Sequence, residues 1–197
     1  MPRKPRKLVD GGYYHLIARG NNRLFLFSLK EGFKVFKELL LESKKKFDWK
    51  LLHYCLMSNH FHLLARMGMG EDLPKLMQYL LFEYSRWYRK ETDYAGHVWQ
   101  GRYKSPFIEQ ESYLLECGRY IERNPIRAGL VRSAEDYLWS SYSHYALGKN
   151  DELIDENPYY AQWGQDAAAR QDYYKKFVRL DGPYDKMLDK DFLEEHF

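Results

Sequence analysis

The chain has 197 residues and a mass of 23.8 kDa, so we expect one ordinary domain with an appendage. Its hydrophobic fraction of 45% excludes the composition of a disordered chain, and no apolar stretch is long enough to cross a bilayer. The basic start lacks the apolar region of a signal peptide, and two cysteines cannot build a disulfide framework or a zinc ribbon. We therefore expect a cytoplasmic protein.

Charge is divided unevenly along the chain. Residues 1–150 hold 25 Lys and Arg against 16 Asp and Glu, whereas residues 151–197 hold 6 against 12. A body with a net charge of +9 favours polyanions, most often nucleic acid. The change of composition after residue 150 predicts one domain over 1–150 and an acidic helical extension over 151–197. The acidity of this extension either shields the basic surface of residues 1–150 or keeps the protein soluble.

The first predicted elements are a strand and a helix. Tyr13–Arg19 is rich in β-formers and ends at the turn-prone Gly20-Asn21-Asn22, which predicts a strand. Ser28 and Glu31 form a capping box, and apolar residues at helical spacing follow them up to the lysine run at 44–46.

A β-hairpin and a second helix follow. Lys50–Met57 and His60–Met67 are apolar runs separated by the two-residue turn signal Ser58-Asn59, which predicts a hairpin. Asp72–Thr92 returns to helical spacing, with Arg and Lys on its polar face.

The remaining patterns complete an α+β fold. His97–Ile108 is predicted as a fourth strand, Ser112–Asn124 as a helix that Pro125 ends, and Asp166–Leu180 as a short tail helix. The order βαββαβ is the ferredoxin-like arrangement on an antiparallel sheet, with an added helix and a C-terminal helical tail. In it the third strand is central, both crossover helices cover one face, and the other face stays open.

Two histidines stand on the predicted third strand. The period of two along a strand places the imidazoles of His60 and His62 on the open face, about 7 Å apart, while Phe61 points to the helices. They can converge on one divalent cation, although a His-x-His pair on a strand is more often structural. His53 on the neighbouring strand is either a supporting partner or an ordinary half-buried residue.

The predicted third helix carries a second polar set. Tyr120 and Asn124 are four residues apart and share one helix face, with Glu116 one turn earlier. The opposite, apolar stripe consists of Leu114, Cys117 and Ile121. The amide of Asn124 could complete a metal site begun by the two histidines.

These residues lie in longer motifs: HYCLMSNHFHLL, WQGRYKSPFIEQESYLLECGRYIERNPIRAGLV, EDYLWSSY and the early RGNN. From about Tyr13 to Tyr142 the sequence resembles the single-tyrosine HUH transposases, particularly the REP-associated tyrosine transposases. The resemblance implies cleavage of single-stranded DNA, in which a tyrosine hydroxyl attacks a phosphodiester to leave a 5′-phosphotyrosine and a free 3′-OH. It also implies Mg²⁺ or Mn²⁺, held by the two histidines and a polar residue on the tyrosine helix.

Carried over residue by residue, the resemblance makes Tyr120 the nucleophile, His60 and His62 metal ligands, and Asn124 the third ligand. Two neutral imidazoles and a neutral amide leave the charge of the ion largely available to the phosphate. Expected DNA-binding residues around this site are Arg102, Lys104, Arg119, Arg123 and Arg127.

The expected partner is single-stranded DNA with hairpins, bound by a monomer or homodimer, with no membrane association. The alternative is a domesticated relative that grips DNA hairpins as a regulator with little or no strand transfer. An RNA-binding domain of similar topology should show an aromatic RNP-type strand, which the sequence lacks. A two-histidine phosphoesterase needs a second histidine motif, and the contexts of His97, His144 and His196 do not match one.

Overall fold

The computed structural model describes residues 5–27, 29–180, 182 and 185. One antiparallel sheet has the strand order β2-β3-β1-β4. Its strands are β1 (Tyr13–Arg19), β2 (Trp49–Met57), β3 (His60–Met67) and β4 (Phe107–Ile108). Helix α1 (Lys30–Lys46) joins β1 to β2, and α2 (Asp72–Thr92) joins β3 to β4. This confirms the ferredoxin-like βαββαβ order with β3 as a central strand.

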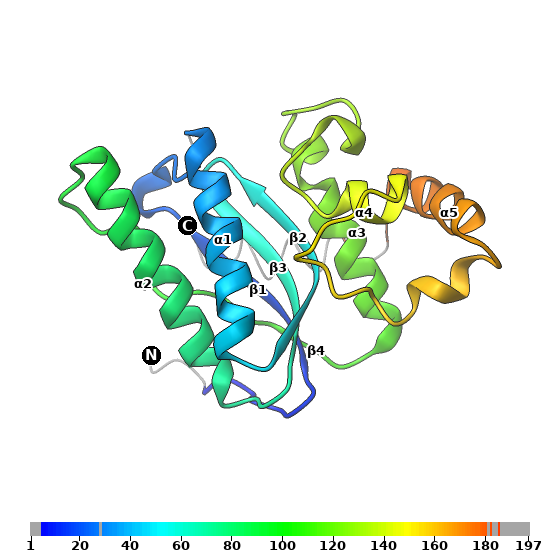
Figure 1. Cartoon of the computed structure of the whole chain (residues 1–197), viewed down its shortest axis with the longest axis horizontal. Coiled ribbons are helices and arrows are strands. Elements are labelled where there is room, and N and C mark those ends of the chain that lie inside the picture. Colours follow the sequence, from blue (N-terminus) through cyan, green and yellow to red (C-terminus); the bar gives the residue numbers. More distant parts are fainter. Residues whose placement is uncertain (1–4, 28, 181, 183–184, 186–197) are drawn as a thin grey trace.

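Helices α1 and α2 lie side by side on one face of the sheet (Figure 1). Phe61 and Leu63 of β3 point to this face and pack with Phe36 of α1 and Leu80 of α2 in the larger core. Burial of these apolar side chains is the main force that holds the two layers together. The expected capping residue Ser28 lies outside the described residues, and Leu29 stands at the N-cap of α1.

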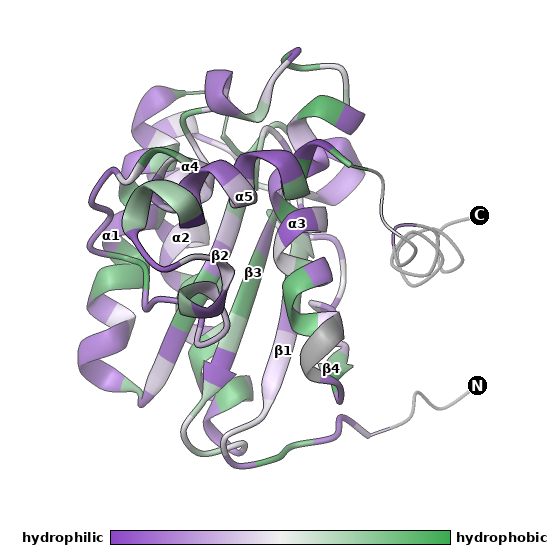
Figure 2. Ribbon diagram, turned by 90° about the vertical axis from the view of Figure 1, so that its right-hand side faces the viewer, coloured by the Kyte–Doolittle hydropathy of each residue, from purple (hydrophilic) through white to green (hydrophobic). Residues whose placement is uncertain are grey.

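The sequence analysis predicts that the second face of the sheet is open. In the structure this face is covered, so that prediction is wrong. The face is covered by α3 (Glu111–Arg127), and the later helices α4 (Tyr142–Leu147) and α5 (Ala167–Arg179) continue this layer (Figures 1 and 2). Leu114, Cys117, Tyr120 and Ile121 of α3 form a second core with sheet residues. The reason is the apolar stripe of α3, which is buried only against this face.

The fourth strand is much shorter than the predicted His97–Ile108. Only Phe107–Ile108 pairs regularly with β1, while Trp99 and Lys104 form isolated bridges to the same edge. Gly101 adopts a left-handed conformation with φ of +59°, and Pro106 has no N–H to donate. The segment therefore follows β1 without forming a continuous ladder.

Helix α3 extends through Pro125 to Arg127, beyond its predicted end at Asn124. The side-chain amide of Asn124 donates to the carbonyl of Ile121 at 3.3 Å, the acceptor that the missing N–H of Pro125 would have served. Gly129, two residues after the last helical residue Arg127, has a φ of +67° and terminates the helix with the two reverse hydrogen bonds of a Schellman motif.

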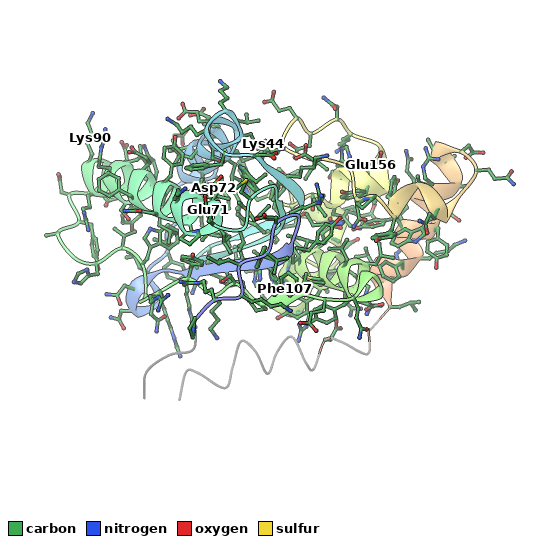
Figure 3. The ribbon with its side chains drawn as sticks, turned by 90° about the horizontal axis from the view of Figure 1, so that it is seen from below. Lys44, Glu71, Asp72, Lys90, Phe107 and Glu156 are labelled. Carbon is green, nitrogen blue, oxygen red and sulfur yellow. The ribbon has the colours of Figure 1, made fainter. Side chains whose placement is uncertain are left out.

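The predicted tail helix is confirmed as α5, with Asp166 at its N-cap accepting from the N–H of Ala169. The segment before α5 is bonded to α1, because Lys44 of α1 donates to the carbonyl of Leu153 and pairs with Asp155. Figure 3 labels Lys44 on α1 and Glu156 on this segment. The predicted domain boundary at residue 150 stays a prediction. Within the described residues, no helix is long and apolar enough to span a membrane.

Candidate active site

The two histidines of β3 lie under α3. His62 pairs across the sheet with Ile17 of β1 and Cys55 of β2, so its side chain enters the layer between sheet and α3. It is 1% exposed, whereas His60 at the start of the strand is half-buried. Their ring centroids are 4.9 Å apart, so the imidazoles meet as predicted, but in a covered layer.

Each histidine uses its Nδ1 atom in a short side-chain contact. His60 Nδ1 lies 2.7 Å from Asn59 Oδ1, and because the amide oxygen only accepts, the imidazole donates. His62 Nδ1 lies 3.0 Å from Nε2 of His15, a buried residue of β1. In both rings the atom that remains for a cation is Nε2.

Burial keeps these imidazoles neutral. Desolvation lowers the pKa of His60 to about 4, helped by the nearby charge of Arg19, and lowers the pKa of His15 to about 3. The pKa of His62 lies well below its usual value, first through burial and then through its neighbours, Arg127 among them. Neutral imidazoles are the form that binds metal ions.

Tyr120 lies against this histidine group. Its ring meets His62 edge to face at a centroid distance of 6.1 Å and His15 at 6.0 Å. The guanidinium of Arg127 lies 5.0 Å from the centre of the ring, and the tyrosine is 3% exposed. The structure therefore brings together the predicted nucleophile, the predicted ligand pair and one predicted DNA-binding arginine.

Asn124 follows Tyr120 by one helical turn and is half-buried. Its amide nitrogen donates to the carbonyls of Tyr120 at 2.9 Å and Ile121 at 3.3 Å. Since the nitrogen is committed to the helix backbone, the amide oxygen is the atom that can serve as a ligand. Among the described residues, no group of three or more His, Cys, Asp or Glu side chains could hold a metal ion.

Two of the predicted DNA-binding arginines are turned away from the surface. Arg119 is 3% exposed, pairs with Glu116 and lies over the ring of Phe177 at 4.9 Å. Arg123 donates to the carbonyl of Leu180. Both lie on the face of α3 that the C-terminal segment covers, so they do not form the exposed basic margin described by the sequence analysis. Their role in DNA binding stays a prediction. Arg102 and Arg127 are exposed and Lys104 is half-buried.

One interpretation of the sequence makes His53 a supporting partner of His60 and His62. In the structure, His53 instead contacts α3. It is buried, and its Nδ1 lies 3.0 Å from Glu122 of α3. The histidine neighbour that sequence reasoning missed is His15. Strand alternation in YYHLIAR places it on one face with Ile17 and Arg19, but its contact with β3 follows only from the strand order β3-β1.

Comparisons with known proteins show which family the chain is similar to. Residues 8–124 match the family described as "Transposase IS200 like". A Haemophilus influenzae protein named as a REP-associated tyrosine transposase is 22% identical over 147 residues, covering 70% of this chain and 83% of its own length.

A solved structure described as a REP-associated tyrosine transposase bound to a REP hairpin has a TM-score of 0.64. It is 14% identical and covers 80% of this chain and 99% of its own, which shows that the fold is shared. The family match includes β1, the histidines of β3 and α3 as far as Asn124, and spans more than half of the sequence. The chain therefore belongs to the family of IS200-like transposases.

Proposed function

We propose that this transposase cleaves and transfers single-stranded DNA through Tyr120. The phenol oxygen attacks the scissile phosphorus as the bond to the 3′ oxygen breaks. The phenol loses its proton, the departing oxygen gains one, and the products are a 5′-phosphotyrosine link and a free 3′-OH. The observation that carries this proposal is the edge-to-face contact of Tyr120 with His62 at 6.1 Å.

His60, His62 and Asn124 would hold the Mg²⁺ or Mn²⁺ ion. The donor chemistry fits, because both imidazoles are neutral with Nδ1 already bonded, and the amide nitrogen of Asn124 is bonded to its own helix. An uncharged ligand set leaves the charge of the ion to the phosphate. When bound, the ion would polarise the phosphate and neutralise charge that develops on its oxygens.

The proposed substrate has an unpaired cleavage position beside a hairpin. The excess of basic residues over 1–150 suits a polyanion, and Arg102, Lys104 and Arg127 remain exposed or half-exposed beside β1 and α3. Because a solved relative is described as bound to a REP hairpin, we propose that this protein binds a DNA hairpin next to the cleavage position.

A hairpin-binding regulator without turnover is the second candidate. The observation in its favour is the burial of Tyr120 beneath Arg127, since a nucleophile that is 3% exposed must be uncovered before a phosphate can reach it. Both candidates bind the same DNA, and only the first forms a covalent adduct.

Labelled single-stranded oligonucleotides from the DNA that flanks the gene test these proposals. With Mn²⁺ or Mg²⁺, wild-type protein should form a denaturant-resistant adduct, and Tyr120→Phe should bind the strand without forming one. Tyr113→Phe, a half-buried tyrosine of the same helix, is the matched control and should retain the adduct. Binding without adduct in wild type supports the regulator, and an unchanged adduct in Tyr120→Phe excludes Tyr120 as nucleophile. Equal cleavage of a perfect duplex contradicts the single-strand substrate.

A further inference from the structure

We propose that His15 is a positioning residue of this site, which accepts a hydrogen bond from Nδ1–H of His62 and so keeps the Nε2 lone pair of His62 available for a divalent cation. The inference rests on the proposed function, because it assigns His62 as a ligand. His15 itself holds no metal in this proposal.

The strands fix the contact between the two rings. His15 pairs with Leu64 and His62 pairs with Ile17, so the two histidines are diagonal neighbours on one face of β1 and β3. Their nitrogens are 3.0 Å apart, and the rings stack with centroids at 5.2 Å and an interplanar angle of 30°. The backbone N–H of His15 also donates to the carbonyl of Pro106 at 3.0 Å, which holds β1 on its other edge.

Two neutral imidazoles that share one hydrogen bond have two possible arrangements. His15 is 0% and His62 is 1% exposed, and such burial disfavours a charged imidazole. With both rings neutral, one ring donates and the other accepts. If His15 donated from Nε2, the proton of His62 would sit on its own Nε2 and block that atom as a ligand. If His62 donates from Nδ1, its Nε2 carries a lone pair.

The second ligand shows the same pattern. Nδ1 of His60 donates to Asn59 Oδ1, an acceptor that permits only one tautomer. With His15 as acceptor, both ligand rings carry the proton on Nδ1 and a lone pair on Nε2. A hydrogen-bond partner on the far nitrogen is the usual way in which proteins orient a metal-binding imidazole.

The test compares His15→Gln with His15→Phe. Glutamine places an amide oxygen close to the position of Nε2 and can accept from His62, whereas phenylalanine retains a stacked ring without an acceptor. Leu153→Ala, in the other core, controls for loss of stability alone. Two quantities are measured: the tautomer of His62 in metal-free protein by nitrogen NMR, and the Kd for Mn²⁺ by water-proton relaxation.

We expect His62 to carry its proton on Nδ1 in wild type and in His15→Gln, and to shift toward Nε2 in His15→Phe. The Kd for Mn²⁺ should rise at least ~10-fold in His15→Phe, the usual effect of losing such a partner, and stay near wild type in His15→Gln and Leu153→Ala. A proton on Nε2 of His62 in wild type overturns the inference without any variant, as does an unchanged Kd in His15→Phe. If these results hold but wild type forms no Tyr120 adduct, the proposed cleavage through Tyr120 fails, while the ligand role of His62 and the role of His15 stand.

Discussion

The hydroxyl of Tyr174 donates to Glu122 Oε2 at 2.6 Å, and both side chains are buried. The other carboxylate oxygen lies 3.0 Å from His53 Nδ1 and accepts from Ser141 Oγ at 2.5 Å. Glu122 stands two residues after Tyr120, so this cluster bonds α5 to the helix that carries the proposed nucleophile. Helix α5 of the acidic C-terminal extension therefore helps to hold α3, and with it Tyr120, in position.

Tyr174→Phe should lower the free energy of unfolding by about 1.5–3 kcal/mol, because a buried carboxylate oxygen loses its donor. Urea denaturation measures the change. Tyr173→Phe, on the exposed side of the same helix, is the control and should leave stability unchanged. Equal stabilities of the two variants would mean that the Tyr174 hydroxyl contributes nothing to the attachment of α5.

Asn124 has two separable roles, one for each end of its amide. Asn124→Asp keeps an oxygen ligand but loses the donor to Ile121, so unfolding free energy should fall by about 1 kcal/mol while Mn²⁺-dependent adduct formation persists. Adding Pro125→Ala restores a backbone N–H for that carbonyl and should recover the lost stability. A double variant no more stable than Asn124→Asp would contradict the helix-repair role.

Much of this arrangement is local enough to be predicted from sequence. The strand Tyr13–Arg19, the hairpin around Ser58-Asn59 and the helix Asp72–Thr92 depend on alternation, turn chemistry and helical spacing, and all three are confirmed. The same periodicity placed His60 and His62 on one face.

What the sequence could not supply is the packing of distant segments. The stripe on α3 was predicted, but which face of the sheet it would cover was not, and the histidines were therefore expected in the open. The contact of His15 with His62 joins residues 47 positions apart and depends on strand order. Likewise, the burial of Arg119 and Arg123 follows from the position of the C-terminal segment, which has no local signal in α3.

Replacement of the two proposed ligand histidines should have unequal effects on stability. On an open face, both replacements would change the free energy of unfolding little. Because His62 is 1% exposed, His62→Ala should lower the free energy of unfolding by about 2–4 kcal/mol. His60→Ala should cost about 1 kcal/mol, since that side chain is half-buried. Both variants should lose Mn²⁺-dependent adduct formation. Urea denaturation curves recorded with a metal chelator measure the unfolding free energies of both variants. Equal losses of unfolding free energy in His60→Ala and His62→Ala would contradict the burial of His62.

Acid should destabilise the metal-free protein at a pH well above the range where carboxylates titrate. The folded-state pKa values of His60 and His15 are lowered to about 4 and about 3, whereas unfolded histidine titrates near pH 6.5. Between these values the unfolded state binds more protons, so stability falls as pH decreases, by up to about 1.4 kcal/mol per pH unit for each histidine. Urea midpoints from pH 7.5 to 4.5 measure this slope, and His15→Gln should reduce it. A flat profile would mean that these histidines are protonated in the folded state.

Arg127 and Arg119 lie on one helix, and Arg127 is exposed whereas Arg119 is buried. Arg127 is exposed with its guanidinium over Tyr120, so a phosphate that engages it would approach the nucleophile. Arg127→Gln should weaken single-strand binding and reduce the slope of log affinity against log salt by about 0.7, the value for one lost phosphate contact.

Arg119→Gln is the matched comparison. Because Arg119 is buried in an ion pair with Glu116, its loss should reduce stability and leave the salt slope unchanged. Fluorescence anisotropy of a labelled hairpin with a single-stranded flank, at several salt concentrations, measures both slopes. If Arg119→Gln lowered the slope and Arg127→Gln did not, DNA would bind on the side of α3 that α5 covers. The C-terminal segment would then have to leave α3 before the strand could bind.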